Sequence, residues 1–264
     1  MKFQAYSGTR ARLATAAVMW AARWTPYMEP EMLGLSDLVG EGSVCVDVGS
    51  AAGLYTLALS RLVGERGRVH SVEPLGFAHP ACTRLLGTGG SPNVHHHSVA
   101  LAAEEGRASM SVPVRRGSLV TGRSFLARPL CGLGPNLEFD AHVSVEVDVE
   151  TLDGLCERTG IQRLDFLKID VEGAELQVLQ GGEAAIVRWH PEILVEIEGR
   201  HCARYGNRPG EVAEWLEQRG YAMWAWQGGW RRAESVCPHR RNYLFRQLGP
   251  SAVAAVAAER ARAA

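Results

Sequence analysis

The fold is decided at residues 44–53, which read Val44-Cys45-Val46-Asp47-Val48-Gly49-Ser50-Ala51-Ala52-Gly53. An apolar strand here runs into a turn that contains two glycines, and leucines with helical spacing follow over residues 55–62. Glycine permits backbone conformations and a close approach of other groups that a Cβ atom would block. The segment is therefore a strand, a turn and a helix, with Asp47 at the carboxyl end of the strand.

Further strands and helices alternate along the chain. We predict strands at 68–73, 94–100, 164–170, 193–197, 221–226 and 243–245, and helices at 77–87, from 152 onward, at 174–188 and at 209–219. Apolar strands that alternate with helices indicate a parallel sheet with both faces covered. We therefore predict an α/β, Rossmann-like fold with a mostly parallel seven-stranded sheet and helices on both faces.

The chain of 264 residues is long enough for one large α/β domain. We predict a helical segment over residues 1–42, the main domain over 43–248 and a tail over 249–264. Residues 103–145 break the alternation with prolines and glycines, and we interpret them as a strand plus a long excursion inside the main domain. Loops of that length are usually functional, so we expect residues 112–140, with the N-terminal helix, to form a lid.

Composition narrows the class of protein. Hydrophobic residues make up 46% and charged residues 22%, and the formal net charge is −1, so we expect neither nucleic acid nor a membrane surface as a partner. The six cysteines include no C-x-x-C pair, which favours a reducing, cytoplasmic setting. Residues 13–22 are apolar but too short to span a bilayer, and we interpret them as an amphipathic helix rather than a signal peptide.

The glycine turn has the features of a nucleoside-cofactor loop. The dinucleotide fingerprint G-x-G-x-x-G is absent, because Ala51 stands where the second glycine would be. Backbone amides at the start of the next helix suit a carboxylate, whereas Asp47 suits an ammonium group. Glu73 closes the next strand, where an acid can accept both ribose hydroxyls. Together these residues favour S-adenosylmethionine (SAM); the alternative is a glycine turn in an unrelated α/β protein.

Two predicted strands end in polar side chains at the sheet edge where α/β proteins bind ligands. The first end carries a lysine and two carboxylates, and the second carries two glutamates near a histidine: Lys168, Asp170 and Glu172, then Glu196, Glu198 and His201. An aliphatic alcohol is a poor nucleophile, so a metal or a positioned base must help remove its proton. We predict Asp170, Glu198 and Glu172 as ligands of Mg²⁺. Asp170, Glu198 and His201, with Lys168 as orienter or alternative base, are expected to activate the acceptor.

Structural alternatives stay open for these residues. Glu172 could be an ordinary charge at a helix start, Glu196 could belong to a buried ion-pair network, and His201 could lie on the surface. The triplet His95-His96-His97 suggests a metal site, but alternation sends neighbouring side chains of a strand to opposite faces, which argues against one.

The chain resembles the FkbM family of SAM-dependent methyltransferases. The matching pieces span about residues 43–248, and the most specific one is Lys168-Ile169-Asp170-Val171-Glu172-Gly173-Ala174-Glu175. The resemblance implies a class I methyltransferase fold that O-methylates macrolide or sugar hydroxyls. It also implies SAM contacts by the matching positions Asp47, Gly49, Gly53, Tyr55, Thr56, Glu73, Pro74 and Ala100. Residues 50–52 depart from the family's commoner Ala-Asn-x, and residues 103–142 match nothing that identifies the acceptor.

We therefore expect an O-methyltransferase that transfers the methyl group of SAM to a hydroxyl of a sugar, polysaccharide or polyketide-type acceptor with the help of Mg²⁺. The expected partner is a small-molecule or oligosaccharide acceptor, and a homodimer is compatible with the sequence. Two alternatives remain: an NAD(P)-dependent reductase of Rossmann fold, and a SAM-binding module without catalysis.

Overall fold

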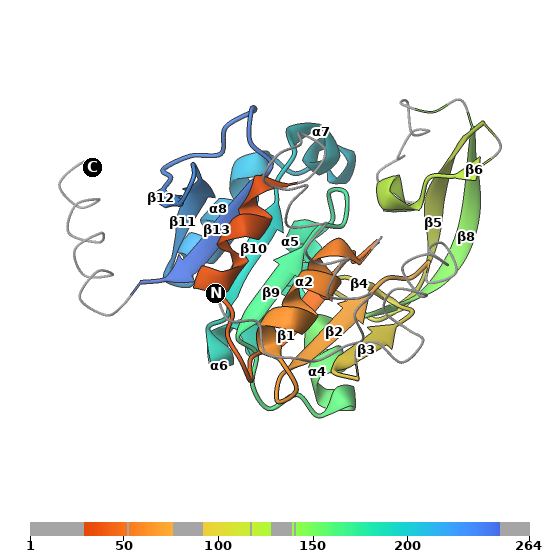
Figure 1. Ribbon diagram of the computed structural model, residues 1–264. Coiled ribbons are helices and arrows are strands. Elements are labelled where there is room, and N and C mark those ends of the chain that lie inside the picture. Colours follow the sequence, from red (N-terminus) through yellow and green to blue (C-terminus); the bar gives the residue numbers. More distant parts are fainter. Residues whose placement is uncertain are drawn as a thin grey trace.

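The main sheet contains eight strands in the computed structural model, which describes residues 29–51, 53–75, 92–116, 118–127, 139 and 141–248. The strand order is β12-β11-β13-β10-β9-β1-β2-β3 (Figure 1). The strands are β1 (Val44–Val48), β2 (Arg68–Val72), β3 (Val94–His97), β9 (Phe166–Ile169), β10 (Glu192–Glu196), β11 (Tyr221–Trp226), β12 (Trp230–Arg232) and β13 (Asn242–Gln247).

The sheet is parallel except around β13 and β12. Strands β3, β2, β1, β9 and β10 are parallel neighbours, whereas β13 is antiparallel to β10 and β11, and β12 is antiparallel to β11. The predicted class I, Rossmann-like fold is thus confirmed. The sheet has one strand more than we predicted, because the short strand β12 folds back on β11 after the turn at Gly228.

Helices cover both faces of this sheet, and the alternation of side chains along β1 shows how. Cys45 faces η1 (Pro30–Asp37) and α2 (Leu54–Val63), and Val46 and Val48 face the opposite layer. That layer consists of α4 (Leu152–Thr159), α5 (Glu175–Gln180), α6 (Glu183–Trp189) and α8 (Pro209–Glu217). The single helix predicted over 174–188 is two helices, since Gly181 and Gly182 separate α5 from α6.

A second sheet replaces most of the predicted excursion at 103–145. Its strands are β4 (Ala100–Leu101), β5 (Gly106–Arg115), β6 (Ser118–Leu119), β7 (Phe125–Ala127) and β8 (Ala141–Glu150), with the short helix η3 (Thr121–Arg123) between β6 and β7. Strands β5 and β8 form a long antiparallel pair that projects beside the main sheet (Figure 1). Met110, Val112, Leu126, Val147 and Val149 belong to its own apolar cluster.

Several predictions fall outside the described residues: the N-terminal helix with its tryptophans, the helix at 77–87, the lid residues 128–138 and the tail from 249. Among the helices that the structure does describe, none combines the length and the apolar composition needed to cross a bilayer.

Candidate active site

The glycine loop between β1 and α2 is held against both neighbouring strands. The amides of Gly49 and Ser50 donate to the carbonyl of Val72 at the end of β2, at 2.9 and 3.1 Å. Gly49 has φ +75°, and a Cβ atom there would overlap the carbonyl oxygen of Asp170, which follows β9. Only glycine therefore lets the loop lie directly over the end of β9.

Gly49→Ala is expected to lower the free energy of unfolding by about 2–5 kcal/mol, because left-handed strain adds to the overlap with a backbone oxygen. Urea unfolding measures the loss. The matched control is Gly228→Ala, since Gly228 has φ +72° and no atom lies within 4 Å of the Cβ position. The control should show the strain alone, about 1–2 kcal/mol. Equal losses in the two variants would mean that the overlap with Asp170 is relieved at no cost.

A first pocket of about 600 Å³ lies on the second-sheet side of the loop. Gly49, Glu73, Pro74 and Asp170 line it from segments that follow strands of the main sheet, and the second sheet with η3 closes it through Ala100, Met110, Gly122, Ser124 and Leu126. Glu73 is fixed there, because its two carboxylate oxygens accept the amides of Ala51 and Leu75 at 3.0 and 2.9 Å. Burial raises the pKa of Glu73, and the two amides oppose that shift. Each oxygen keeps a second lone pair for another donor.

A second pocket of about 570 Å³ lies on the other side of the loop, lined by Asp47, Gly49, Tyr55, Lys168 and Asp170 among others. Asp47 accepts the hydroxyl of Thr56 at 2.5 Å, and burial raises the pKa of this carboxyl to about 6. Gly49, Ala51 and Asp170 line both pockets. The two pockets therefore meet at the end of β9.

Lys168 lies at the floor of the second pocket and is 1% exposed. Its Nζ atom is 3.5 Å from Oδ2 of Asp170 and 5.1 Å from the ring centroid of Tyr55. Burial alone would lower the pKa of Lys168, but nearby carboxylates, Asp170 foremost, raise it above its ordinary value. Lys168 is therefore an ammonium ion that fixes Asp170. The hydroxyl of Tyr55 donates to Glu29 at 2.5 Å.

Asp170 is paired with Glu196 from the neighbouring strand. The register of β9 and β10 sets Ile169 opposite Val195, so the next residues, Asp170 and Glu196, lie side by side and are hydrogen bonded. Burial, and then the charge of Asp170, raise the pKa of Glu196 far above its ordinary value. Without a cation, the pair thus holds one proton between two carboxyl groups. Oxygens of Glu29, Asp170 and Glu196 lie within 4.8 Å of one another.

Glu172 points to a different group of side chains. Strand β9 ends at Ile169 and Glu172 has φ +58°, so its side chain leaves the row of Lys168 and Asp170. One carboxylate oxygen lies 3.0 Å from Nδ1 of His201, and the other lies 3.6 Å from a guanidinium nitrogen of Arg123 in η3. Ligand atoms of Glu172, Glu196 and His201 lie within 4.8 Å of one another.

The charges of this second group are unusual. Burial raises the pKa of Glu172 to about 8. Burial, followed by the nearby arginines Arg204, Arg200 and Arg123, lowers the pKa of His201 to about 3. His201 is 1% exposed, so the alternative of a surface histidine is wrong. It is a neutral imidazole able to bind a cation, but a pKa this low makes it a poor proton acceptor.

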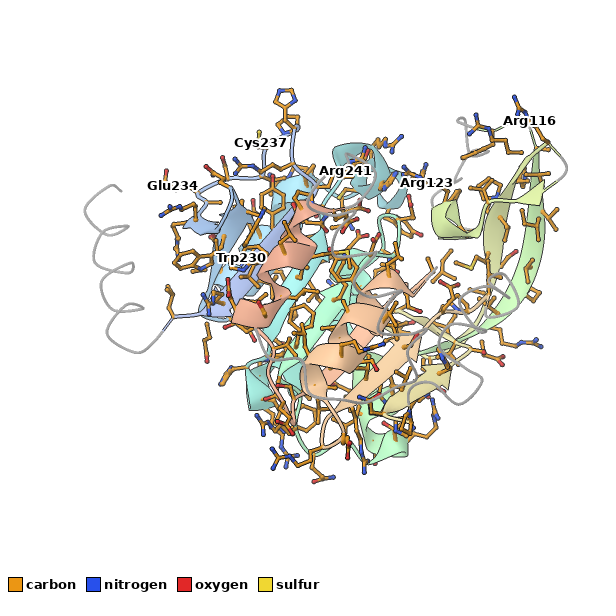
Figure 2. All side chains as sticks on the ribbon, in the orientation of Figure 1. Arg116, Arg123, Trp230, Glu234, Cys237 and Arg241 are labelled. Carbon is orange, nitrogen blue, oxygen red and sulfur yellow. The ribbon has the colours of Figure 1, made fainter. Side chains whose placement is uncertain are left out.

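Glu198 takes a place that the sequence did not predict. It is the N-cap residue that precedes α7 (Gly199–Cys202), and its carboxylate contacts Arg200 and lies 3.5 Å from Nε of Arg241. Figure 2 shows Arg241 and Arg123 at the upper rim of the sheet. Among the described residues, Glu198 is in neither group of metal-type ligands, and Glu196 stands beside Asp170 where we expected Glu198.

Most of the predicted cofactor positions line one of the two pockets, but two do not. Thr56 is fully buried and acts on the site by holding Asp47. Gly53 precedes α2 with φ +71°, and its amide donates to Ser50. The sequence prediction missed Glu29 and Met110 as members of the site, whereas the closing residues Gly122, Ser124 and Leu126 lie within the segment 112–140 that we expected to form a lid. The position of Glu196 at the end of its strand indicated that this residue could belong to the site. Its pairing with Asp170, however, depends on the register of β9 and β10.

The sequence profile of the methyltransferase FkbM domain matches residues 47–223, which include the glycine loop and both strand ends. The chain belongs to the FkbM methyltransferase family. This is a family of SAM-dependent methyltransferases, and the residues present fit that cofactor: a loop free of side-chain bulk at Gly49, and a buried carboxylate beside each pocket.

Curated relatives of this FkbM methyltransferase are distant. It is 26% identical over 206 residues to the AMB antimetabolite synthetase AmbE of Pseudomonas aeruginosa, a match that covers 69% of this chain and only 10% of that protein. It is 25% identical over 190 residues to Methyltransferase 1 of Beauveria bassiana, covering 69% of this chain and 74% of that protein. Among solved structures, methyltransferase FkbM from Methylobacillus flagellatus has 16% identity and a TM-score of 0.45, over 78% of this chain and 44% of that one.

Proposed function

We propose that this protein transfers the methyl group of SAM to a hydroxyl of a sugar, polysaccharide or polyketide-type acceptor, with the help of a hard divalent cation such as Mg²⁺. The observation that carries the proposal is the Asp170–Glu196 carboxyl pair, because Asp170 lines both pockets where they meet. SAM would supply an electrophilic methyl group there. The acceptor hydroxyl then needs a neighbouring group to take or weaken its proton, and the carboxyl pair is suited to that task.

The two pockets suggest how the cofactor would be held. In the proposal, Glu73 accepts both ribose hydroxyls, and Pro74 and Ala100 flank the nucleoside in the first pocket. Asp47 faces the ammonium group of the methionine half in the second pocket, with Tyr55 as its wall. Gly49 lies between the halves, where a side chain would obstruct them.

Glu73→Ala is expected to weaken SAM binding about 10- to 150-fold, the equivalent of about 1.5–3 kcal/mol, because two charge-assisted hydrogen bonds to the ribose are lost. Isothermal titration with SAM measures the effect. Since Glu73 also accepts the amides of Ala51 and Leu75, a thermal melt must show that the variant is folded. Glu65→Ala, which removes an exposed glutamate, is the control. Unchanged affinity in Glu73→Ala would show that the ribose binds elsewhere.

In the proposal, the residues around Asp170 have different roles in activating the acceptor hydroxyl. Asp170 and Glu196 would bind the cation, and Glu29 or the pair of Glu172 and His201 would complete its ligands; this assigns Glu196 to the role that the sequence gave to Glu198. Carboxylates suit hard cations, and the cation would displace the proton shared by the pair. Lys168 is a positioning residue for Asp170, since an ammonium ion that its neighbours keep protonated makes a poor base.

The second sheet would close over the site as a lid. Its segment from η3 to β7 is tied to the main domain at three points: Arg123 pairs with Glu172, the guanidinium of Arg204 lies 4.6 Å from the ring centroid of Phe125, and the hydroxyl of Tyr205 donates to the carbonyl of Leu126 at 2.9 Å. Because this segment also lines the first pocket, we infer that the lid encloses the cofactor as well as the acceptor. A closed site excludes water from the transfer.

Labelled methyl transfer tests the proposed function. The full chain, Mg²⁺ and methyl-labelled SAM are incubated with polyhydroxylated acceptors, and mass spectrometry locates the added methyl group. Label on an acceptor oxygen supports the proposal, and label on nitrogen or carbon contradicts it. SAM binding without turnover on any acceptor would favour the non-catalytic module. The FkbM assignment leaves the NAD(P)-dependent reductase without support, and a titration with NADPH should show no binding.

A further inference from the structure

Three histidines gather on β2 and β3, on strands that the proposed chemistry does not use. His95 and His97 are two residues apart on β3, so they share a face, and the parallel register sets His70 of β2 beside His95. The rings of His95 and His97 each stack on the ring of His70 with centroids 5.3 Å apart. Alternation along β3 thus turns only His96 away from His70. The argument that we made from the sequence against a metal site at residues 95–97 therefore applies to His96, but not to His95 and His97.

Two of these rings meet nitrogen to nitrogen. Nδ1 of His70 and Nε2 of His97 lie 3.0 Å apart. One of them can donate a proton to the other, or both lone pairs can bind one cation. A zinc ion bonds imidazole nitrogen at about 2.0–2.1 Å, and at that distance from both atoms the angle at the ion would be about 94°. A small rotation of either ring would open this angle toward the tetrahedral value.

The surroundings keep these nitrogens available. Burial is the main cause that lowers the pKa of His70 and of His97 to about 4, so both rings are neutral at pH 7, as metal binding requires. His70 is 4% exposed, whereas His97 is half-buried and His95 is exposed, so an ion can reach the group from solvent. After burial, the charge of Arg158 contributes most to the lowered pKa of His97, and Glu150, which pairs with Arg158 at 2.8 Å, partly opposes it.

We propose that His70 and His97 form a two-histidine binding site for a borderline transition-metal ion such as Zn²⁺, with water completing its ligands; His95 stacks on His70, but the nitrogens of the three rings do not all lie within 4.8 Å of one another. Imidazoles select zinc, copper or nickel, whereas Mg²⁺ prefers carboxylates, so this site is chemically distinct from the Asp170–Glu196 pair. The ion would join β3, the last strand of the described main sheet, to β2, whose end carries Glu73. The proposal does not rest on the proposed methyl transfer.

Calorimetric titration of the chelator-treated full chain with Zn²⁺ tests the site. We expect His97→Ala to lose one equivalent of Zn²⁺, or to bind it at least tenfold more weakly. His96→Ala is the matched control, since it removes the adjacent imidazole on the opposite face, and it should bind as the unaltered chain does. Zinc binding elsewhere is common to all three proteins and cancels in the comparison. Unchanged binding in His97→Ala, or an equal loss in His96→Ala, would overturn the proposal.

A second measurement needs no variant. Zn²⁺ should shift the ring resonances of His70 and His97 in NMR spectra of the unaltered chain, and Mg²⁺ at the same concentration should leave them in place. Zn²⁺ should also raise the Tm of the chain by about 5 °C when its free concentration is a hundredfold above Kd, because the ion binds only the folded state. Ring resonances that do not shift when Zn²⁺ is added would show that the three histidines form a stacked, hydrogen-bonded group and do not bind a metal ion.

Discussion

Asp170→Asn is expected to lower kcat by about a thousandfold or more, while the Kd for SAM changes by less than about fivefold. The amide keeps the size of the side chain but neither accepts a proton nor binds a hard cation as a carboxylate does. Because both pockets meet at Asp170, no other described carboxylate replaces it at that point. Single-turnover methyl transfer and SAM titration, measured on the same preparation, separate the two effects.

The control for this prediction must separate catalysis from stability. Asp170→Asn leaves the buried ammonium of Lys168 without its nearest carboxylate, although the side-chain oxygen of Asn242 still lies 3.3 Å from Nζ. Asp165→Asn is a matched variant, since Asp165 precedes the same strand and accepts the amide of Val44 at 2.8 Å. It should cost stability without lowering kcat. A similar fall of kcat in both variants, or a full rate in Asp170→Asn, would remove Asp170 from the chemistry.

The sequence predicted those features of the fold that depend on local patterns. The apolar run of β1, the glycines of the loop and the acid at the end of β2 are short-range signals, and each strand of the parallel part was placed within a few residues. The sequence analysis did not locate strands β5 and β8 of the second sheet, for two different reasons. Pro113 argued against a strand, yet it lies within β5 opposite His142. Residues 141–150 alternate valine with polar side chains, a pattern that predicts a strand and that our interpretation as a loop overlooked.

The candidate site was predictable only as far as single strands allow. Alternation placed Lys168 and Asp170 on one side of β9, and they do face each other. We applied the same alternation to Glu172. That prediction failed because the chain turns soon after the end of β9, where Glu172 has a positive φ. The pairing of Asp170 with Glu196 rather than Glu198 follows from the register of two strands. Register depends on packing across the whole sheet, so no pattern within one strand determines it.

Exhaustive chelation is expected to reduce methyl transfer by about a hundredfold or more, and Mg²⁺ alone should restore it. The reason is the carboxyl pair: the buried Glu196 and the partly exposed Asp170, which share a proton at neutral pH, become two ligands once a cation replaces that proton. Magnesium titrations of activity measure the requirement. Restoration by Mg²⁺ alone also distinguishes this site from the histidine group on β2 and β3, because imidazoles do not favour that ion.

Two variants sharpen the test of metal dependence. Glu196→Gln should raise the Mg²⁺ concentration needed for half-maximal activity at least tenfold, since it removes a carboxylate ligand next to Asp170. Glu198→Gln should change it by less than about threefold, because Glu198 lies against Arg200 and Arg241. The opposite ranking would restore the ligand set predicted from the sequence. Full activity after chelation would instead leave the Asp170–Glu196 pair itself to accept the proton of the acceptor hydroxyl.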